Sequence, residues 1–167
     1  MQPVTSEEQA ARAPEGASRK VAFDTTDAVV QAMYAAICFE LGQRPNYELQ
    51  SKIFIPGARM VRVTDRGVFA FDSASYKQDL DAMISSGELR SFYEHELWRD
   101  TWEFGDIAHI TSAYRMFEGR EGCETGGGIN CIQMFRRDGR WWISAMLWRR
   151  DGEDLEVPVS AKALRGR

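Results

Sequence analysis

The chain has 167 residues, a net charge of −4 and 28% charged residues. This length is typical of a single domain with a tail. Its 44% hydrophobic residues are usual for a globular protein, and its acidic balance disfavours a nucleic-acid partner. No segment approaches the roughly 20 consecutive apolar residues of a membrane span. The sequence therefore predicts a globular protein with no nucleic-acid and no membrane partner.

The cysteine and histidine content predicts neither a disulfide framework nor a metal site. Three cysteines leave at least one thiol unpaired, and two histidines are too few for a histidine-rich site. P-loop, zinc-finger and H-E-x-x-H spacings are absent from the sequence. The N-terminal segment lacks the apolar stretch of a signal peptide. We therefore expect a reduced, cytoplasmic protein with no metal and no cofactor.

The first part of the chain predicts an arm followed by a helix. Residues 1–22 are rich in small, charged and proline residues without apolar periodicity, which predicts a disordered N-terminal arm. Apolar residues then recur at three- and four-residue spacing, which indicates a helix. Asp24 or Thr25 can cap this helix, and Gly42 is expected to end it.

The next elements are short. A second helix is expected to begin at Asn46 and to end at Pro56-Gly57. Two short strands, 60–63 and 68–71, follow. A third helix begins with a capping box at Ser75 and ends near Gly87.

The second half of the chain predicts long strands. Two hairpin turns stand out, Gly105-Asp106 and Asp138-Gly139. Helices followed by an antiparallel meander favour an α+β fold, with the helices on one face of a curved sheet. The expected domain spans residues 23–154, and residues 155–167 form a C-terminal tail. Strands are expected at 89–104, 107–118, 129–137 and 141–149, with a loop at 119–128.

Several local phrases resemble the NTF2-like superfamily, which includes SnoaL-like polyketide cyclases, ketosteroid isomerases and scytalone dehydratases. The resemblance implies a cone-shaped fold with three N-terminal helices on a strongly curved antiparallel sheet, and this fold carries many unrelated activities. Phe92-Tyr93-Glu94-His95-Glu96 further resembles an uncharacterised bacterial group of the SnoaL-like branch. The other phrases are Met33-Tyr34, Ile53-Phe54-Ile55-Pro56-Gly57-Ala58, Phe104-Gly105-Asp106-Ile107-Ala108-His109 and Gly139-Arg140-Trp141-Trp142-Ile143.

The isomerase residues of the superfamily are not carried over. Tyr34 matches the tyrosine of the first helix, but Arg62 stands where the resemblance implies a carboxylate base. The inward candidates on the late strands, Asn130, Ile132 and Met134, include no carboxylate.

The first hairpin turn permits an expectation about which side chains face inward. If Gly105-Asp106 is a two-residue turn, Phe104 pairs with Ile107 and the pairing continues outward. The resemblance places Ala108 inside the cone, so alternate residues of both strands share that face. The predicted ligand pocket is then formed by Tyr34, His95, Arg99, Ser112 and Tyr114.

Within this predicted pocket, His95 is the best catalytic candidate, because an imidazole exchanges protons near neutral pH. Tyr34, Tyr114 and Arg99 are expected to hold a developing enolate or carboxylate. An alternative for Arg99 is a salt bridge to an acid beneath the helices.

The same reasoning around Asp138-Gly139 leaves apolar side chains on the outer face of the sheet. Soluble monomers rarely expose large apolar patches, so these residues predict a homodimer. The alternative is that the tail from about Leu155 to Leu164 covers the patch and keeps the protein monomeric. The predicted interface residues are Cys131, Gln133, Phe135, Trp142, Met146 and Trp148.

Three functions remain open from the sequence. One is a cofactor-free lyase, isomerase or cyclase that acts on a small apolar molecule in the cone. The second is a non-catalytic protein that binds such a molecule, and the third is an assembly module that uses the sheet for association.

Overall fold

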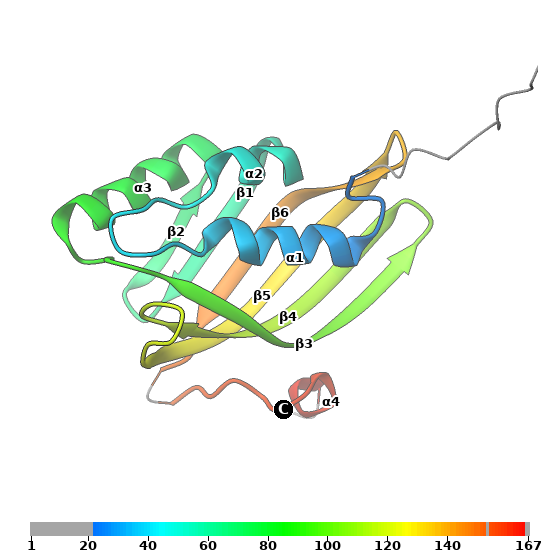
Figure 1. Cartoon of the computed structure of the whole chain (residues 1–167). Coiled ribbons are helices and arrows are strands. Elements are labelled where there is room, and N and C mark those ends of the chain that lie inside the picture. The colour runs from blue at the N-terminus through cyan, green and yellow to red at the C-terminus, as the bar shows by residue number, and fades with distance from the viewer. Residues whose placement is uncertain (1–21, 153, 166–167) are drawn as a thin grey trace, which may run out of the picture.

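A mixed sheet with strand order β2-β1-β6-β5-β4-β3 is the main layer of the computed structural model, which describes residues 22–152 and 154–165 (Figure 1). Neighbouring strands pair antiparallel except β1 and β6, which are parallel. The predicted arm lies outside the described residues apart from Ala22. The strands are β1 Phe54–Thr64, β2 Gly67–Phe71, β3 Tyr93–Phe104, β4 Ile107–Phe117, β5 Glu124–Arg137 and β6 Arg140–Arg150.

Three helices precede β3 and cover the concave face of the sheet: α1 Thr26–Ile37, α2 Tyr47–Ile53 and α3 Ser73–Ser86. Their caps explain where they begin, because each cap side chain accepts a hydrogen bond from a first-turn amide. Thr25 Oγ1 accepts from Ala28 at 3.1 Å, and Asn46 Oδ1 accepts from Leu49 at 2.9 Å. Asp72, rather than Ser75, is the N-cap of α3, and the two form a capping box.

Helix α1 ends at Ile37, earlier than the predicted stop at Gly42. The amide of Phe39 donates to the carbonyl of Phe92 at 2.8 Å, and Phe92 returns the bond at 2.9 Å. This bridge draws the chain out of the helix and ties it to the start of β3, because its backbone groups are satisfied there instead.

The hairpin turns form as predicted. Phe104 pairs with Ile107, and Asp138 and Gly139 adopt φ values of 55° and 77°, as a turn with two left-handed residues requires. β5, however, begins at Glu124, so Gly126, Gly127 and Gly128 lie in a strand and not in a loop.

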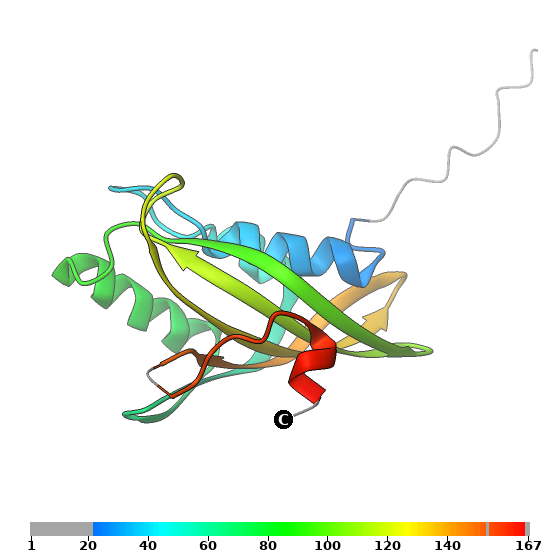
Figure 2. The ribbon, with the colours of Figure 1, turned by 90° about the horizontal axis from the view of Figure 1, so that it is seen from below.

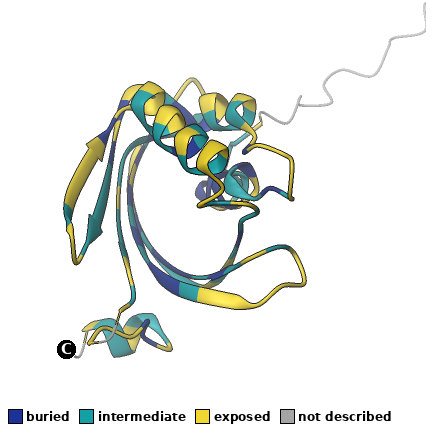
Figure 3. Cartoon of the chain, turned by 90° about the vertical axis from the view of Figure 1, so that its left-hand side faces the viewer, coloured by how far each residue is buried: buried dark blue, intermediate teal, exposed yellow. Residues whose placement is uncertain are grey.

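Bulges give the sheet its curvature. Leu97 of β3 and Ser144 of β6 each stand without a partner where the pairing register shifts by one residue. A bulge bends its strand and increases the local twist. The sheet consequently curls around the core, and buried residues line its concave side (Figure 3). The α+β cone with three N-terminal helices is thereby confirmed.

The C-terminal tail returns along the convex side of the sheet and ends in the short helix α4, Ala161–Arg165 (Figure 2). Trp98 Nε1 donates to the carbonyl of Pro158 at 2.7 Å, and Arg165 pairs with Asp100. Val157 and Pro158 are buried. The tail therefore covers the part of the outer face that β3 contributes around Trp98.

Among residues 22–152 and 154–165, no helix combines the length and the apolar character needed to cross a membrane.

Candidate functional site

The bulge at Leu97 decides which side chains of β3 enter the cone. From the hairpin turn back to Trp98, β3 pairs with β4 in the predicted register. On the other side of Leu97, toward the start of β3, the pairing is offset by one residue, so that Glu96 pairs with Tyr114 and His95 with Arg115. A shift of one residue exchanges the two faces of a strand. The sequence-based register was therefore wrong in this half of β3. Glu94 and Glu96 face the interior, and His95 faces outward.

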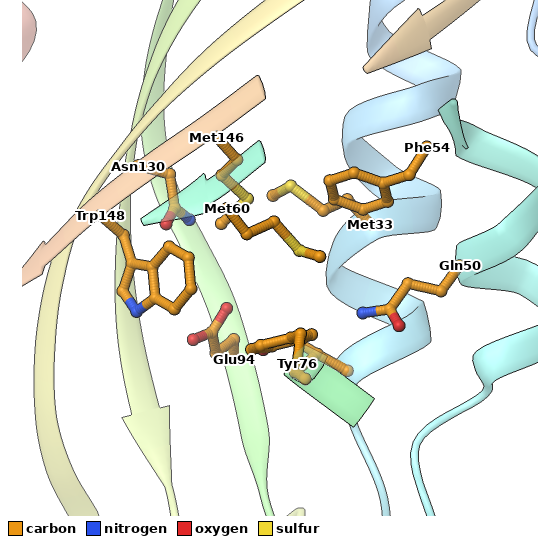
Figure 4. Close-up of a pocket in the computed structure, with 10 residues that line it drawn as sticks. Met33, Gln50, Phe54, Met60, Tyr76, Glu94, Asn130, Met146 and Trp148 are labelled. Carbon is orange, nitrogen blue, oxygen red and sulfur yellow. The ribbon is translucent and has the colours of Figure 1, made fainter. Parts of the chain in front are cut away.

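Glu94 reaches into a cavity between α1, α3 and β6 (Figure 4). The cavity and the open solvent at its mouth together hold about 430 Å³ of atom-free space, and the enclosed centre of the cavity is narrow. Its wall is mostly apolar, and its polar groups come from Glu94, Asn130, Gln50, Tyr76 and Trp148. The apolar wall consists of Met33, Ile37, Phe54, Met60 and Met146.

The Glu94 carboxyl is the titratable group of this cavity that ionises closest to neutral pH. Within the described part of the chain it makes no side-chain hydrogen bond and no ion pair. Burial among apolar groups disfavours its charged form and raises its pKa to about 8, although the positive charge of Arg150 acts in the opposite direction. Glu94 therefore changes protonation state close to neutral pH.

Glu96 lies on the same face but in a different environment. Arg99 donates to it from Nε at 2.9 Å and from Nη2 at 2.5 Å, and Arg99 Nη1 pairs with Asp27 of α1 at 2.7 Å. Ser112, which is fully buried, donates to Glu96 Oε1 at 2.5 Å. Glu96 is thus a satisfied structural carboxylate that ties β3 to α1 and β4.

This network continues into the cavity through Tyr34 and Asn130. The Tyr34 hydroxyl lies 2.6 Å from Ser112 Oγ, and Asn130 Nδ2 donates to the Tyr34 hydroxyl at 3.2 Å. Because the only hydroxyl proton of Ser112 goes to Glu96, Tyr34 must be the donor in its contact with Ser112. Its oxygen is then free to accept from Asn130. The donor and the acceptor of each hydrogen bond in the chain Asn130–Tyr34–Ser112–Glu96 are thereby fixed.

These hydrogen bonds orient the side-chain amide of Asn130, a residue that is 1% exposed. Its Nδ2 is held by Tyr34, and its Oδ1 forms no hydrogen bond with a described residue. Figure 4 shows this oxygen on the Trp148 side of the amide. Asn130 therefore presents a hydrogen-bond acceptor to the cavity.

The structure brings most of the predicted pocket residues together. Tyr34, Ser112 and Arg99 are linked through Glu96, and Tyr114 is buried beside β5. Arg99 forms the salt bridge that was the alternative for it.

Gly128 allows the close approach of Tyr114, because a Cβ atom there would lie 2.5 Å from the Tyr114 hydroxyl. Burial raises the pKa of both Tyr34 and Tyr114, so each stays a neutral phenol.

His95 lies apart from this group. Its side chain is exposed, and its ring stacks edge-on against Phe117 at a centroid distance of 5.2 Å. It borders an outer groove that Tyr34 and Glu94 also line, but it does not line the inner cavity of Figure 4. The geometry gives His95 no contact with the buried network.

The bulge at Ser144 divides the predicted interface residues between the inner and the outer face of the sheet. Beyond it, Ile132 pairs with Met146 and Asn130 with Trp148, so that Met146 and Trp148 line the inner cavity and do not belong to the outer face. The other four predicted residues, which precede the bulge or lie on β5, remain on the outer face: Cys131, Gln133, Phe135 and Trp142.

Sequence reasoning missed Glu94, Met146 and Trp148, because it extended each hairpin register through a bulge. The residue pattern of β3 gave one signal of its bulge. Strict alternation in β3 places two glutamates on one side and a histidine and a leucine on the other, with no clean apolar face. No cluster of three or more histidine, cysteine or acidic side chains that could hold a metal occurs in the described ranges.

No model of a protein family matches the chain, and no curated protein is significantly similar to it. Solved structures are similar in fold. A protein of unknown function from Mycobacterium tuberculosis is 20% identical, with 78% of this chain and 76% of that chain covered and a TM-score of 0.55. A LinA-type hexachlorocyclohexane dehydrochlorinase from Novosphingobium barchaimii LL02 is 14% identical, with 79% and 94% covered and a TM-score of 0.55.

A third similar structure carries the name of the fold. It is an NTF-2 like protein of unknown function from Silicibacter pomeroyi DSS-3, 12% identical, with 74% of this chain and 91% of that chain covered and a TM-score of 0.53. Identities this low show the fold alone. The chain therefore has the cone-shaped α+β fold of the NTF2-like superfamily, as the resemblance of its sequence implied.

Proposed function

We propose that the cone cavity binds a small, largely apolar molecule and that Glu94 exchanges a proton with it, without a cofactor. The observation that carries this proposal is an unpartnered carboxyl in a mostly apolar cavity. A burial cost of this kind is normally relieved by a partner or by neutralisation, and a group left in this state is a candidate for function.

The proton chemistry of Glu94 suits acid–base catalysis. A general acid or base works best when its pKa lies near the working pH, and burial raises the pKa of Glu94 to about 8. The neutral phenol of Tyr76 and the amide of Gln50 face the same cavity and can donate hydrogen bonds to a developing negative charge. Lyase, isomerase or cyclase chemistry fits this set, and a dehydrochlorinase occurs among proteins of this fold.

The size of the cavity limits the molecule. The 430 Å³ of atom-free space reaches into open solvent, and the enclosed centre of the cavity is much smaller than the roughly 300–1,000 Å³ of a typical small-molecule site. Methionine side chains form three parts of the wall, and they adapt their shape more easily than branched ones. We therefore expect a molecule no larger than a ring of benzene size with a short substituent, which enters as these methionine side chains move aside.

A non-catalytic binder is the second candidate, and one experiment separates the two. A fragment screen by thermal shift should give hits that raise the melting temperature, since a ligand stabilises the state that binds it. Hits are then assayed for turnover with the wild type, Glu94→Gln and the control Glu88→Gln, whose side chain is exposed outside the cavity. We expect Glu94→Gln to lose at least a hundredfold in turnover and the control to lose none.

Turnover that survives Glu94→Gln would assign the chemistry to another group. Binding without turnover in the wild type would leave the cavity as a non-catalytic site. A screen without a hit that depends on a cavity residue would contradict the proposal as a whole.

The protein is further proposed to form a homodimer through the part of the outer sheet face that the tail leaves open. Trp102, Phe104 and Ile107 are 57%, 73% and 51% exposed, and Phe135 and Trp142 continue the same row across β5 and β6. An apolar patch of this extent usually marks an interface. The tail covers Trp98 but not this row.

Light scattering at micromolar concentration is expected to give twice the chain mass of 19.0 kDa. Ile107→Glu should return the mass to that of one chain, because it places a charge in the centre of the patch. Val68→Glu is the control, since Val68 is 69% exposed on β2 at the far end of the sheet. A single species of one chain mass for the wild type would contradict the dimer.

A further inference from the structure

Two polar groups at the Glu94 end of the cavity offer hydrogen-bond acceptors. Glu94 offers a carboxyl without a partner, and Asn130 offers its Oδ1, because the chain through Tyr34 and Ser112 holds its amide nitrogen. Asn130 is 1% exposed, so this acceptor lies in the interior and not at the surface. Two unpaired acceptors that line one cavity favour a ligand that brings its own donors.

Two aromatic rings frame the same end. The rings of Tyr76 and Trp148 are 5.8 Å apart and inclined at 80°. The two rings are in edge-to-face contact, and Figure 4 shows the Glu94 carboxyl beside them, with Met33 and Phe54 farther away. Aromatic faces carry negative electrostatic potential and attract cations, most strongly at tryptophan.

We propose that the molecule bound in the cavity is an amine that is protonated at neutral pH and is carried on an apolar body. Its ammonium group pairs with Glu94, donates to Asn130 Oδ1 and contacts the aromatic pair of Trp148 and Tyr76. The apolar body occupies the end formed by Met33, Phe54 and Met60. This inference rests on the proposed function and names the class of its ligand.

Binding of such a cation releases a proton. Below pH 8 the free protein holds Glu94 as a neutral acid. When an alkylammonium ion enters, the O–H bond of Glu94 breaks, the proton leaves to the buffer, and the carboxylate pairs with the ammonium. Charge balances, since one positive charge enters the site and one leaves it. An uncharged ligand of the same shape releases no proton.

Other groups that face Glu94 do not supply this proton between pH 6 and 8. Tyr76 of α3, Tyr34 of α1 and Tyr114 of β4 are phenols whose pKa values burial raises further. Burial also raises the pKa of the Cys38 thiol, which accepts a hydrogen bond from the Glu94 amide. Arg150 of β6 acts on Glu94 as a fixed positive charge. Proton release in this range therefore reports on Glu94.

The test compares benzylamine with benzyl alcohol, which has the same shape without the charge. Isothermal titration calorimetry at pH 6.5, in two buffers of different ionisation enthalpy, gives the protons released per ligand. We expect close to one for benzylamine and none for benzyl alcohol. The affinity for benzylamine should rise nearly tenfold from pH 6 to pH 7, as linkage to one proton requires, and that for benzyl alcohol should not change.

Two variants assign the effect to residues. Glu94→Gln should abolish proton release and weaken the binding of benzylamine at least tenfold, while the binding of benzyl alcohol stays unchanged. The control Glu88→Gln, at an exposed position, should match the wild type. Tyr34→Phe removes the acceptor that holds the Asn130 amide. It should weaken benzylamine several-fold with no change for benzyl alcohol, as expected for a positioning residue.

The possible outcomes separate this inference from the proposed function. Equal binding of the two probes, absent proton release, or benzylamine binding that survives Glu94→Gln would overturn the amine ligand and leave a neutral ligand in the cavity. Binding of neither probe to the folded wild type would count against the inference and against the cavity as a small-molecule site.

Discussion

Glu94→Gln is expected to make the protein more stable than the wild type at alkaline pH. In the folded protein the pKa of Glu94 is raised to about 8 by burial, whereas an exposed glutamate has its usual pKa of 4.5. Between these values the folded state holds a proton that the unfolded state has released. Stability is therefore fully present below the unfolded value and falls as pH rises through the folded value.

The size of the effect follows from the shift. Each pKa unit corresponds to about 1.4 kcal/mol, so the wild type should lose on the order of 3 kcal/mol of unfolding free energy between pH 5 and 9 through this residue, after an allowance for water at the cavity mouth. Glutamine has nearly the same shape and no charge to bury. The variant should match the wild type near pH 5 and exceed it near pH 9.

Urea denaturation at pH 5, 7 and 9 measures this difference directly, with Glu88→Gln as the control because its carboxyl is exposed. The decisive quantity is the difference between variant and wild type at each pH, since other groups that titrate contribute equally to both. A constant difference across the three pH values would contradict an unpartnered, buried Glu94.

The helices and hairpins were predictable because their signals are local. An N-cap asparagine at 46 begins α2, a left-handed glycine at 87 ends α3, and Asp138-Gly139 closes the last hairpin. Each of these residues determines the backbone within a few positions of itself. Even where a boundary was wrong, as at the end of α1, the cause was a distant bridge between Phe39 and Phe92.

The faces of the strands were not predictable beyond the bulges, because a bulge depends on the partner strand. Leu97 and Ser144 carry no local mark, and each shifts the residues of its strand that lie farther from the hairpin turn to the other face. This exchange brought Glu94 into the cavity in place of His95, and moved Trp148 from the expected outer face into the cavity. The bulges that curve the sheet into a cone thus also select the residues that line it.

The network behind the cavity combines residues that the sequence suggested with one that it did not. Tyr34 and Ser112 were expected inside, and they are hydrogen-bonded to each other at 2.6 Å. Glu96, which the assumed register placed outside, is the acceptor at which the chain ends. A buried serine and a buried tyrosine need such an acceptor, so their predicted burial was itself a reason to look for one.

Ser112→Ala is expected to destabilise the protein strongly for so small a change. Ser112 is fully buried, donates to Glu96 at 2.5 Å and accepts from Tyr34. Its removal leaves the Tyr34 hydroxyl without an acceptor in the interior, and an unsatisfied buried polar group costs about 1–3 kcal/mol, with more for a lost bond to a charged group. We expect a loss of about 3 kcal/mol and a lower melting temperature.

Ser144→Ala is the matched control, because Ser144 is bonded through Oγ to Gln133 in an exposed contact, and its loss should cost about 0.5 kcal/mol or less. The double variant Ser112→Ala/Tyr34→Phe tests the chain itself. Removing both hydroxyls leaves no orphaned Tyr34 proton, so the double variant should lose clearly less than the sum of the two single variants. Strictly additive losses in urea denaturation would show that Ser112 and Tyr34 act independently, and the fixed orientation of Asn130 would then lose its physical basis.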